Sequence, residues 1–113
     1  MSAEQISRHR QIARQLDGEA RRHVDQVEQR QGRPLPMDEA RHIYRCAVAS
    51  SAQRQMLEEL KPTTDWLVGQ AAMSLAPVEA PPALAEMRQG IIDVWTAAVS
   101  ELIGPPSGSL PRP

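Results

Sequence analysis

The sequence predicts an all-α fold, a small helical bundle of about four helices with a proline-rich C-terminal tail. Aromatic and β-branched residues, which β-sheets favour, are scarce: the 113 residues include two Trp, one Tyr and no Phe. The ten prolines fall in clusters separated by long stretches rich in Ala, Gln, Arg and Glu, which are strong helix formers. Because proline is disfavoured inside helices, these clusters predict the connections between helices.

The first predicted helix covers residues 2–31. Apolar side chains form one stripe along it when successive residues are placed at 100° steps. Four stripe residues spaced seven apart give a weak heptad pattern: Ile6, Ala13, Ala20 and Val27. Because Gly18 lowers helix propensity, the sequence leaves two alternatives, a long continuous helix or two shorter helices that fold back in a five-helix monomer.

The second predicted helix covers residues 38–60, and its apolar face changes sides near Ser50. The first face holds Ala40, Ile43, Tyr44 and Ala47, and the second holds Ala49, Ala52, Met56 and Leu60. A single straight helix that is buried on one side would keep its apolar residues on that side throughout. The sequence therefore predicts either a bend near Ser50 or two halves that pack against different neighbours, one of which is a partner.

The third predicted helix is short and covers residues 64–76. Pro62 precedes it, and Thr63 or Thr64 provides a suitable N-cap. Three prolines between residues 77 and 82 predict a stiff, extended connection to the next helix.

The fourth predicted helix covers residues 83–103 and has the strongest apolar pattern in the chain. Its stripe is wide, which is typical of a helix that contacts two neighbours. A Gly-Pro-Pro sequence ends it, and residues 104–113 are expected to form a flexible tail because they contain almost no apolar side chains to bury. We expect residues 1–103 to form a single domain.

Residues capable of chemistry do not form a recognisable catalytic or metal site. Glu19 precedes His23 by four residues, as Asp38 precedes His42, so each pair shares a helical face. Neither pair has the Glu-x-x-His spacing of di-iron bundles, and local ion pairs at the edge of the core are the favoured interpretation. A helix contact that responds to the protonation of a histidine is the weaker alternative.

Cys46 lies four residues after His42, but no third orienting residue or oxyanion loop accompanies the pair. The sequence also has no glycine-rich phosphate loop and no zinc-ligand spacing. We therefore predict a protein that is not an enzyme and that carries no cofactor and no metal.

The charges permit nucleic-acid binding only as an alternative function. The chain has 13 basic and 14 acidic residues, and the arginines are concentrated in the first third. Acidic residues are interleaved with them, whereas a helix that binds DNA presents a basic face. A small nucleic-acid-binding regulator that uses the Arg-rich N-terminal helices is therefore the second hypothesis.

The favoured prediction is a non-catalytic interaction module, such as an adaptor, an accessory subunit or an inhibitor. A first helix of about 45 Å is long for so small a bundle, so part of its apolar stripe is expected to bind a partner or a second copy. The expected partner-binding residues are the stripe Ile6, Ala13, Ala20 and Val27 and the rim Arg10, Arg14 and Arg21. The second apolar face of the helix over residues 38–60 is also expected to contact the partner.

The sequence also predicts a cytoplasmic protein. It contains no apolar stretch of about 18 residues that would span a membrane, and its first residues lack the basic and apolar regions of a signal peptide. A single cysteine is typical of a protein in a reducing compartment. We expect no contact with membranes.

Overall fold

The computed structural model describes residues 1–104, which form three α-helices and no β-strand. Helix α1 spans Ala3–Gln31, α2 spans Met37–Ser74 and α3 spans Pro82–Ile103. The all-α class is confirmed, but the predicted count of four helices is not. Residues 105–113 of the predicted tail lie outside the described residues.

Helix α1 is continuous over its 29 residues. It begins with a capping box. The backbone N–H of Gln5 donates to Ser2 Oγ over 3.2 Å, and the backbone N–H of Ser2 donates to Oε1 of the Gln5 side chain over 2.8 Å. It ends at Gly32, whose φ of 69° suits a residue without a Cβ atom. Gly18 does not interrupt the helix, so the five-helix alternative is wrong.

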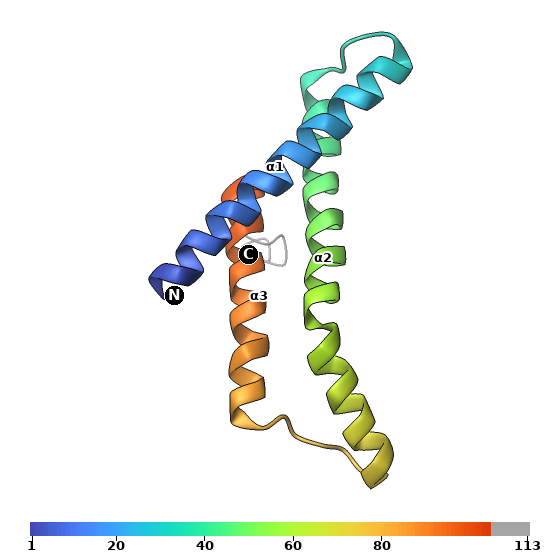
Figure 1. Cartoon of the computed structure of the whole chain (residues 1–113). Helices are drawn as coiled ribbons and strands as arrows, with labels where there is room; N and C mark the ends of the chain where they lie inside the picture. Colours follow the sequence, from blue (N-terminus) through green and yellow to red (C-terminus); the bar gives the residue numbers. More distant parts are fainter. Residues whose placement is uncertain (105–113) are drawn as a thin grey trace, which may run out of the picture.

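Helix α2 contains both the second and the third predicted helix, because Pro62 lies inside it and does not end it. Proline removes one backbone donor and crowds the preceding turn. Here the hydroxyl of Thr63 donates to the Leu60 carbonyl over 2.8 Å, and Arg88 of α3 donates to the hydroxyls of Thr63 and Thr64 over 2.6 and 2.8 Å. These contacts tie the proline turn to α3, and in Figure 1 α2 changes direction near this point and continues.

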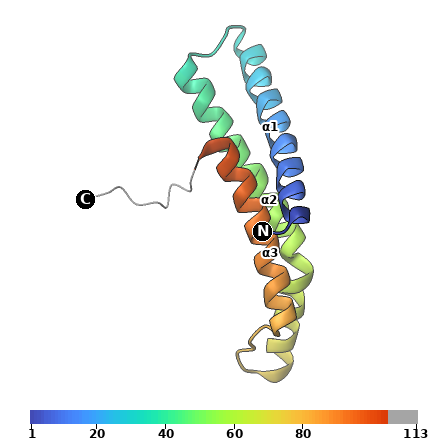
Figure 2. The ribbon, with the colours of Figure 1, turned by 90° about the vertical axis from the view of Figure 1, so that its left-hand side faces the viewer.

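The three helices overlap only in the middle of the molecule. In Figure 1, α1 runs diagonally across α2 and the C-terminal part of α3, and Figure 2 shows α1 on one side of the other two. The N-terminal half of α2 and the C-terminal half of α1 form one two-helix arm, and the C-terminal part of α2 forms a second arm with the start of α3. The radius of gyration is 17.8 Å, whereas a compact domain of this length has about 13 Å.

The core lies where all three helices meet, and small side chains make up much of it. Its buried members are Ile12, Ala13, Leu16 and Ala20 of α1, Val48 and Ala52 of α2, and Val94, Trp95 and Ala98 of α3. Alanine allows helices to approach closely but buries little apolar area. The core is therefore small for a chain of this length.

The change of apolar face along α2 is explained by its two neighbours. In its first half, the Tyr44 hydroxyl donates to Asp17 Oδ1 of α1 over 2.6 Å. In its second half, Glu59 accepts a hydrogen bond of 3.0 Å from Trp95 Nε1 of α3. The first half of α2 therefore lies against α1, whereas the second half contacts both α1, through Ser51 and Glu59, and α3.

Candidate interaction surfaces

The middle of the heptad stripe of α1 belongs to the core of the molecule. Ala13 and Ala20 are 3% and 1% exposed, so the expectation that they belong to an exposed stripe is wrong. Ile6, near the N-terminus, is exposed, and Val27 is half-buried. The periodicity identified the side of α1 that becomes buried, and α2 and α3 are what bury it.

Two of the three rim arginines are available to a partner. Arg10 and Arg14 are exposed and line a shallow hollow with Glu101 and Leu102 of α3. Arg21 instead pairs with Asp17, with its Nε 3.0 Å from Oδ2. The hydrogen bond from Tyr44, followed by that from Arg21, holds the pKa of Asp17 below its usual value.

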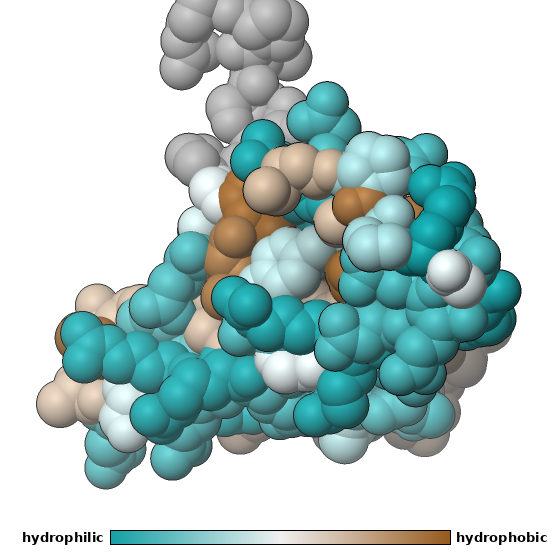
Figure 3. Space-filling model, turned by 90° about the horizontal axis from the view of Figure 1, so that it is seen from above, coloured by the Kyte–Doolittle hydropathy of each residue, from teal (hydrophilic) through white to brown (hydrophobic). Residues whose placement is uncertain are grey.

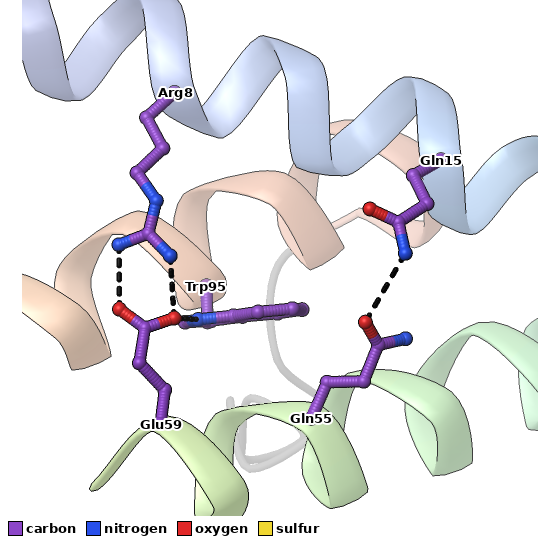
Figure 4. Close-up of polar contacts among 5 residues, drawn as sticks. All are labelled: Arg8, Gln15, Gln55, Glu59 and Trp95. Atoms are coloured by element: carbon purple, nitrogen blue, oxygen red, sulfur yellow. Dashed lines mark hydrogen bonds and ion pairs between the residues drawn. The ribbon is translucent and has the colours of Figure 1, made fainter.

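A polar cluster that the sequence did not reveal joins all three helices (Figure 4). Both terminal nitrogens of Arg8 on α1 donate to the carboxylate of Glu59 on α2, and the indole of Trp95 on α3 donates to the same carboxylate. The hydrogen bonds from Arg8 and Trp95 lower the pKa of Glu59, against an opposing effect of burial. The members lie 51 and 36 residues from Glu59, so helical spacing gives no signal for the cluster.

The chemistry-bearing residues named by the sequence are dispersed in the structure. Glu19 accepts hydrogen bonds from Gln15 and from Ser51 of α2, and His23 is exposed. The Sγ atom of Cys46 lies 3.6 Å from Nε2 of His42 on the exposed face of α2. Residues 1–104 contain no group of three or more His, Cys, Asp and Glu placed to bind a metal ion.

Helices α2 and α3 form a groove with a volume of about 260 Å³. We call it the α2–α3 groove. It is lined by Arg45, Ala49, Ala52, Gln53 and Met56 of α2, by Trp95, Thr96, Val99, Ser100 and Ile103 of α3, and by Gly104. In Figure 3, which looks at the molecule from the end that carries the α1–α2 connection, hydrophobic surface is visible in a hollow between hydrophilic side chains.

The α2–α3 groove contains the second apolar face that the sequence identified in this part of α2. Ala49, Ala52 and Met56 belong to that face and line the groove, whereas Leu60 is buried further along α2. Arg45 is the one charged residue of the lining, and it has no carboxylate partner among the described residues. The groove is therefore mainly apolar, with Gln53, Thr96 and Ser100 as its uncharged polar residues, and it is positively charged at one end.

Comparisons with protein-family models, with curated proteins and with solved structures give no match for this chain. Within residues 1–104, no helix is both long and apolar enough to cross a membrane.

Proposed function

We propose that the protein is a non-catalytic interaction module that binds an apolar helix of a partner protein in the α2–α3 groove. The observation that carries the proposal is the groove itself, an apolar channel between two helices on a surface that α1 does not cover. Binding of an amphipathic helix between two others is a common mode of peptide recognition. A helix in this position adds a fourth member to the bundle.

The lining of the groove indicates the chemistry of that helix. Small side chains such as Ala49 and Ala52 allow a close approach, and Met56 adapts to different apolar side chains. Arg45 at one end favours a carboxylate on the partner, since an arginine pairs well with an Asp or Glu side chain. We therefore expect an apolar partner face with an acidic residue at the end that lies near Arg45.

The groove is also held in shape before a partner binds. Trp95 lines it and is buried, and its indole is oriented by the carboxylate of Glu59, which Arg8 binds from α1. Side chains that are already ordered lose less conformational entropy on binding. The polar cluster therefore supports binding without contacting the partner.

A pair of identical substitutions on α2 tests the proposal. Ala49 and Ala72 are both exposed, but only Ala49 lines the groove. When a tagged chain is purified from its native cells, light scattering should show a complex heavier than the 12.5 kDa monomer. The Ala49→Glu change should weaken it at least tenfold, whereas Ala72→Glu should leave it intact.

The same experiment separates the possible outcomes. Arg45→Glu should weaken the binding of a partner that has an acidic residue near this position. Replacing that acidic residue of the partner with lysine should restore its binding to the Arg45→Glu variant. A monomer that captures nothing, or a complex that survives Ala49→Glu, contradicts the proposal. If the complex contains only this chain, the occupant of the groove is a second copy of the protein and not a different partner.

Nucleic-acid binding is the alternative function, and no structural observation favours it. Two arginines of the N-terminal region are engaged by carboxylates of the chain itself, Arg8 by Glu59 and Arg21 by Asp17. Retardation of a DNA or RNA duplex at low salt that weakens steeply as salt is added would favour this alternative.

A further inference from the structure

The α2–α3 groove has dimensions that suit one extended hydrocarbon chain. Its lining runs from Arg45 to Met56 on α2, which corresponds to about 16 Å of helix, and from Trp95 to Gly104 on α3, which corresponds to about 14 Å. A saturated chain advances about 1.25 Å per carbon, because C–C bonds of about 1.5 Å meet at a nearly tetrahedral angle. A chain of about ten carbons therefore has nearly the length of the groove.

The lining of the groove suits such a chain chemically. Ala52 and Trp95 are 4% and 5% exposed, so they form its bottom, and Val99 and Ile103 beside them are partly buried. Burial of an alkyl chain against these side chains is favourable in proportion to the apolar area removed from water. The volume of about 260 Å³ is slightly below the roughly 300 Å³ of the smallest sites for drug-sized molecules, as expected for a slender ligand.

The positive charge of Arg45 has no acidic neighbour on α2 to balance it. None of the four residues that adjoin Arg45 on the surface of this helix is acidic: they are Arg41, His42, Val48 and Ala49. Asp38 is the closest acidic residue on the same side of α2, and it lies seven residues away, about 10 Å along the helix. That distance exceeds the screening length at physiological salt, which is about 8 Å.

The rest of the chain near this end of the groove supplies no carboxylate to Arg45 either. Glu101 of α3 adjoins the lining in sequence, but it faces another hollow, which it shares with Arg10 and Arg14 of α1. Residues 105–113, which follow Gly104 in the chain, contain no Asp and no Glu. An apolar channel thus ends at a guanidinium group whose charge is available to an anionic ligand.

We propose that the α2–α3 groove binds a saturated alkyl carboxylate of about ten carbons. The hydrocarbon chain lies along the groove toward Met56 and Trp95, and the carboxylate pairs with Arg45, whose planar guanidinium binds both carboxylate oxygens. Because this ligand and the partner helix of the proposed function occupy the same surface, each excludes the other. This regulatory consequence rests on the proposed function, whereas the ligand site does not.

A titration of the purified full chain with sodium decanoate, followed by calorimetry below the micelle concentration, tests the site. Decyltrimethylammonium has the same alkyl chain and the opposite charge, and it should bind at least tenfold more weakly than decanoate. Each CH₂ group removed should weaken binding about fourfold, so octanoate should bind roughly fifteenfold more weakly than decanoate.

Two matched pairs of variants locate the ligand. Arg45→Gln should weaken decanoate binding at least tenfold and remove the preference for the carboxylate, whereas Arg54→Gln, at an exposed position of α2 outside the groove, should leave the affinity within twofold. Met56→Gln should weaken binding at least threefold, and Met73→Gln, also outside the groove, should not. Circular dichroism checks that each variant is folded.

The possible outcomes separate this inference from the proposed function. The decanoate titration needs no partner, so it can succeed when no complex is isolated from cells, and a complex can be isolated when decanoate fails to bind. No binding of decanoate, equal binding of the two head groups, or equal weakening by Arg45→Gln and Arg54→Gln overturns the ligand site. Decanoate that binds only after residues 105–113 are deleted also overturns it, since that segment is then the occupant. A partner complex that forms equally well when decanoate saturates the chain overturns the mutual exclusion.

Discussion

Replacement of Glu59 by glutamine tests whether the polar cluster connects the three helices. Glu59 is the shared acceptor for Arg8 of α1 and Trp95 of α3, and its side chain is 27% exposed. Glutamine has nearly the same shape, but it carries no charge and places an NH₂ group opposite one of the donors. The substitution therefore removes the ion pair and at least one hydrogen bond without creating a cavity.

The expected loss of unfolding free energy is about 1.5 kcal/mol. A partly exposed ion pair contributes roughly 0.2–1 kcal/mol, and a hydrogen bond to a charged acceptor contributes about 1.5 kcal/mol or more when both groups are buried. Because the Arg8 side chain is 45% exposed, we expect the sum of the ion-pair and hydrogen-bond contributions to lie near the lower end of these values. In urea, a slope of about 1.5 kcal/mol per M then moves the midpoint down by about 1 M.

The pH dependence of the same variant gives the sharper check. The folded-state pKa of Glu59 is lowered, so its stabilising effect is complete above the ordinary pKa of a glutamate and is lost as pH falls through the folded-state value. Urea unfolding followed by circular dichroism should therefore show a large difference between the two proteins at pH 7 and a much smaller one near pH 3. Glu58→Gln is the control, because Glu58 is exposed and has no hydrogen bond or ion pair among the described residues. A difference at pH 7 no larger than that of the control, or one that persists at pH 3, refutes the reasoning.

Two further predictions concern the core and the contact between α1 and α2. Leu16→Ala should lower the unfolding free energy by about 3–4 kcal/mol, measured by urea unfolding, because Leu16 is fully buried; a loss similar to that of exposed Gln11→Ala would contradict the packing. Tyr44 is the only tyrosine in the chain, and burial, followed by its hydrogen bond to Asp17, raises its pKa to about 12, so its absorbance should titrate near that pH and not near 10. Stability should accordingly fall as pH rises from about 10 through 12, where the unfolded chain releases the phenolic proton first, and Tyr44→Phe should remove that part of the fall.

Local patterns in the sequence predicted the outer two helices closely. Residues 2–31 and 83–103 were expected to be helical, and α1 and α3 span Ala3–Gln31 and Pro82–Ile103. Both helices are bounded by residues with strong local preferences, such as Ser2, Gly32 and Gly104, and such preferences act over a few residues. The expected break at Pro62 failed for a different reason: Arg88, which lies 25 residues from Thr63, binds the proline turn from another helix.

The candidate surfaces were harder to predict than the helices, because periodicity shows which side of a helix is apolar but not what covers that side. The heptad residues Ala13 and Ala20 proved to be core, whereas the second apolar face of α2, with Ala49 and Met56, proved to line a groove. Trp66 belonged to an apolar face in the sequence, yet it is partly exposed because α1 does not extend over its arm. Coverage depends on how the helices cross, which is a property of the whole chain.

The unequal lengths of the helices explain why apolar surface is left uncovered. The 38 residues of α2 correspond to about 57 Å of helix, whereas the 22 residues of α3 correspond to about 33 Å. Helix α1 crosses this pair at one end, so a full three-helix layer exists only in the middle, and each arm has two helices. Two helices bury only part of their apolar faces against each other, so a third helix at either arm adds burial that this chain does not supply. The proposed partner helix should therefore stabilise the folded protein as it binds, by an amount set by its concentration relative to its Kd.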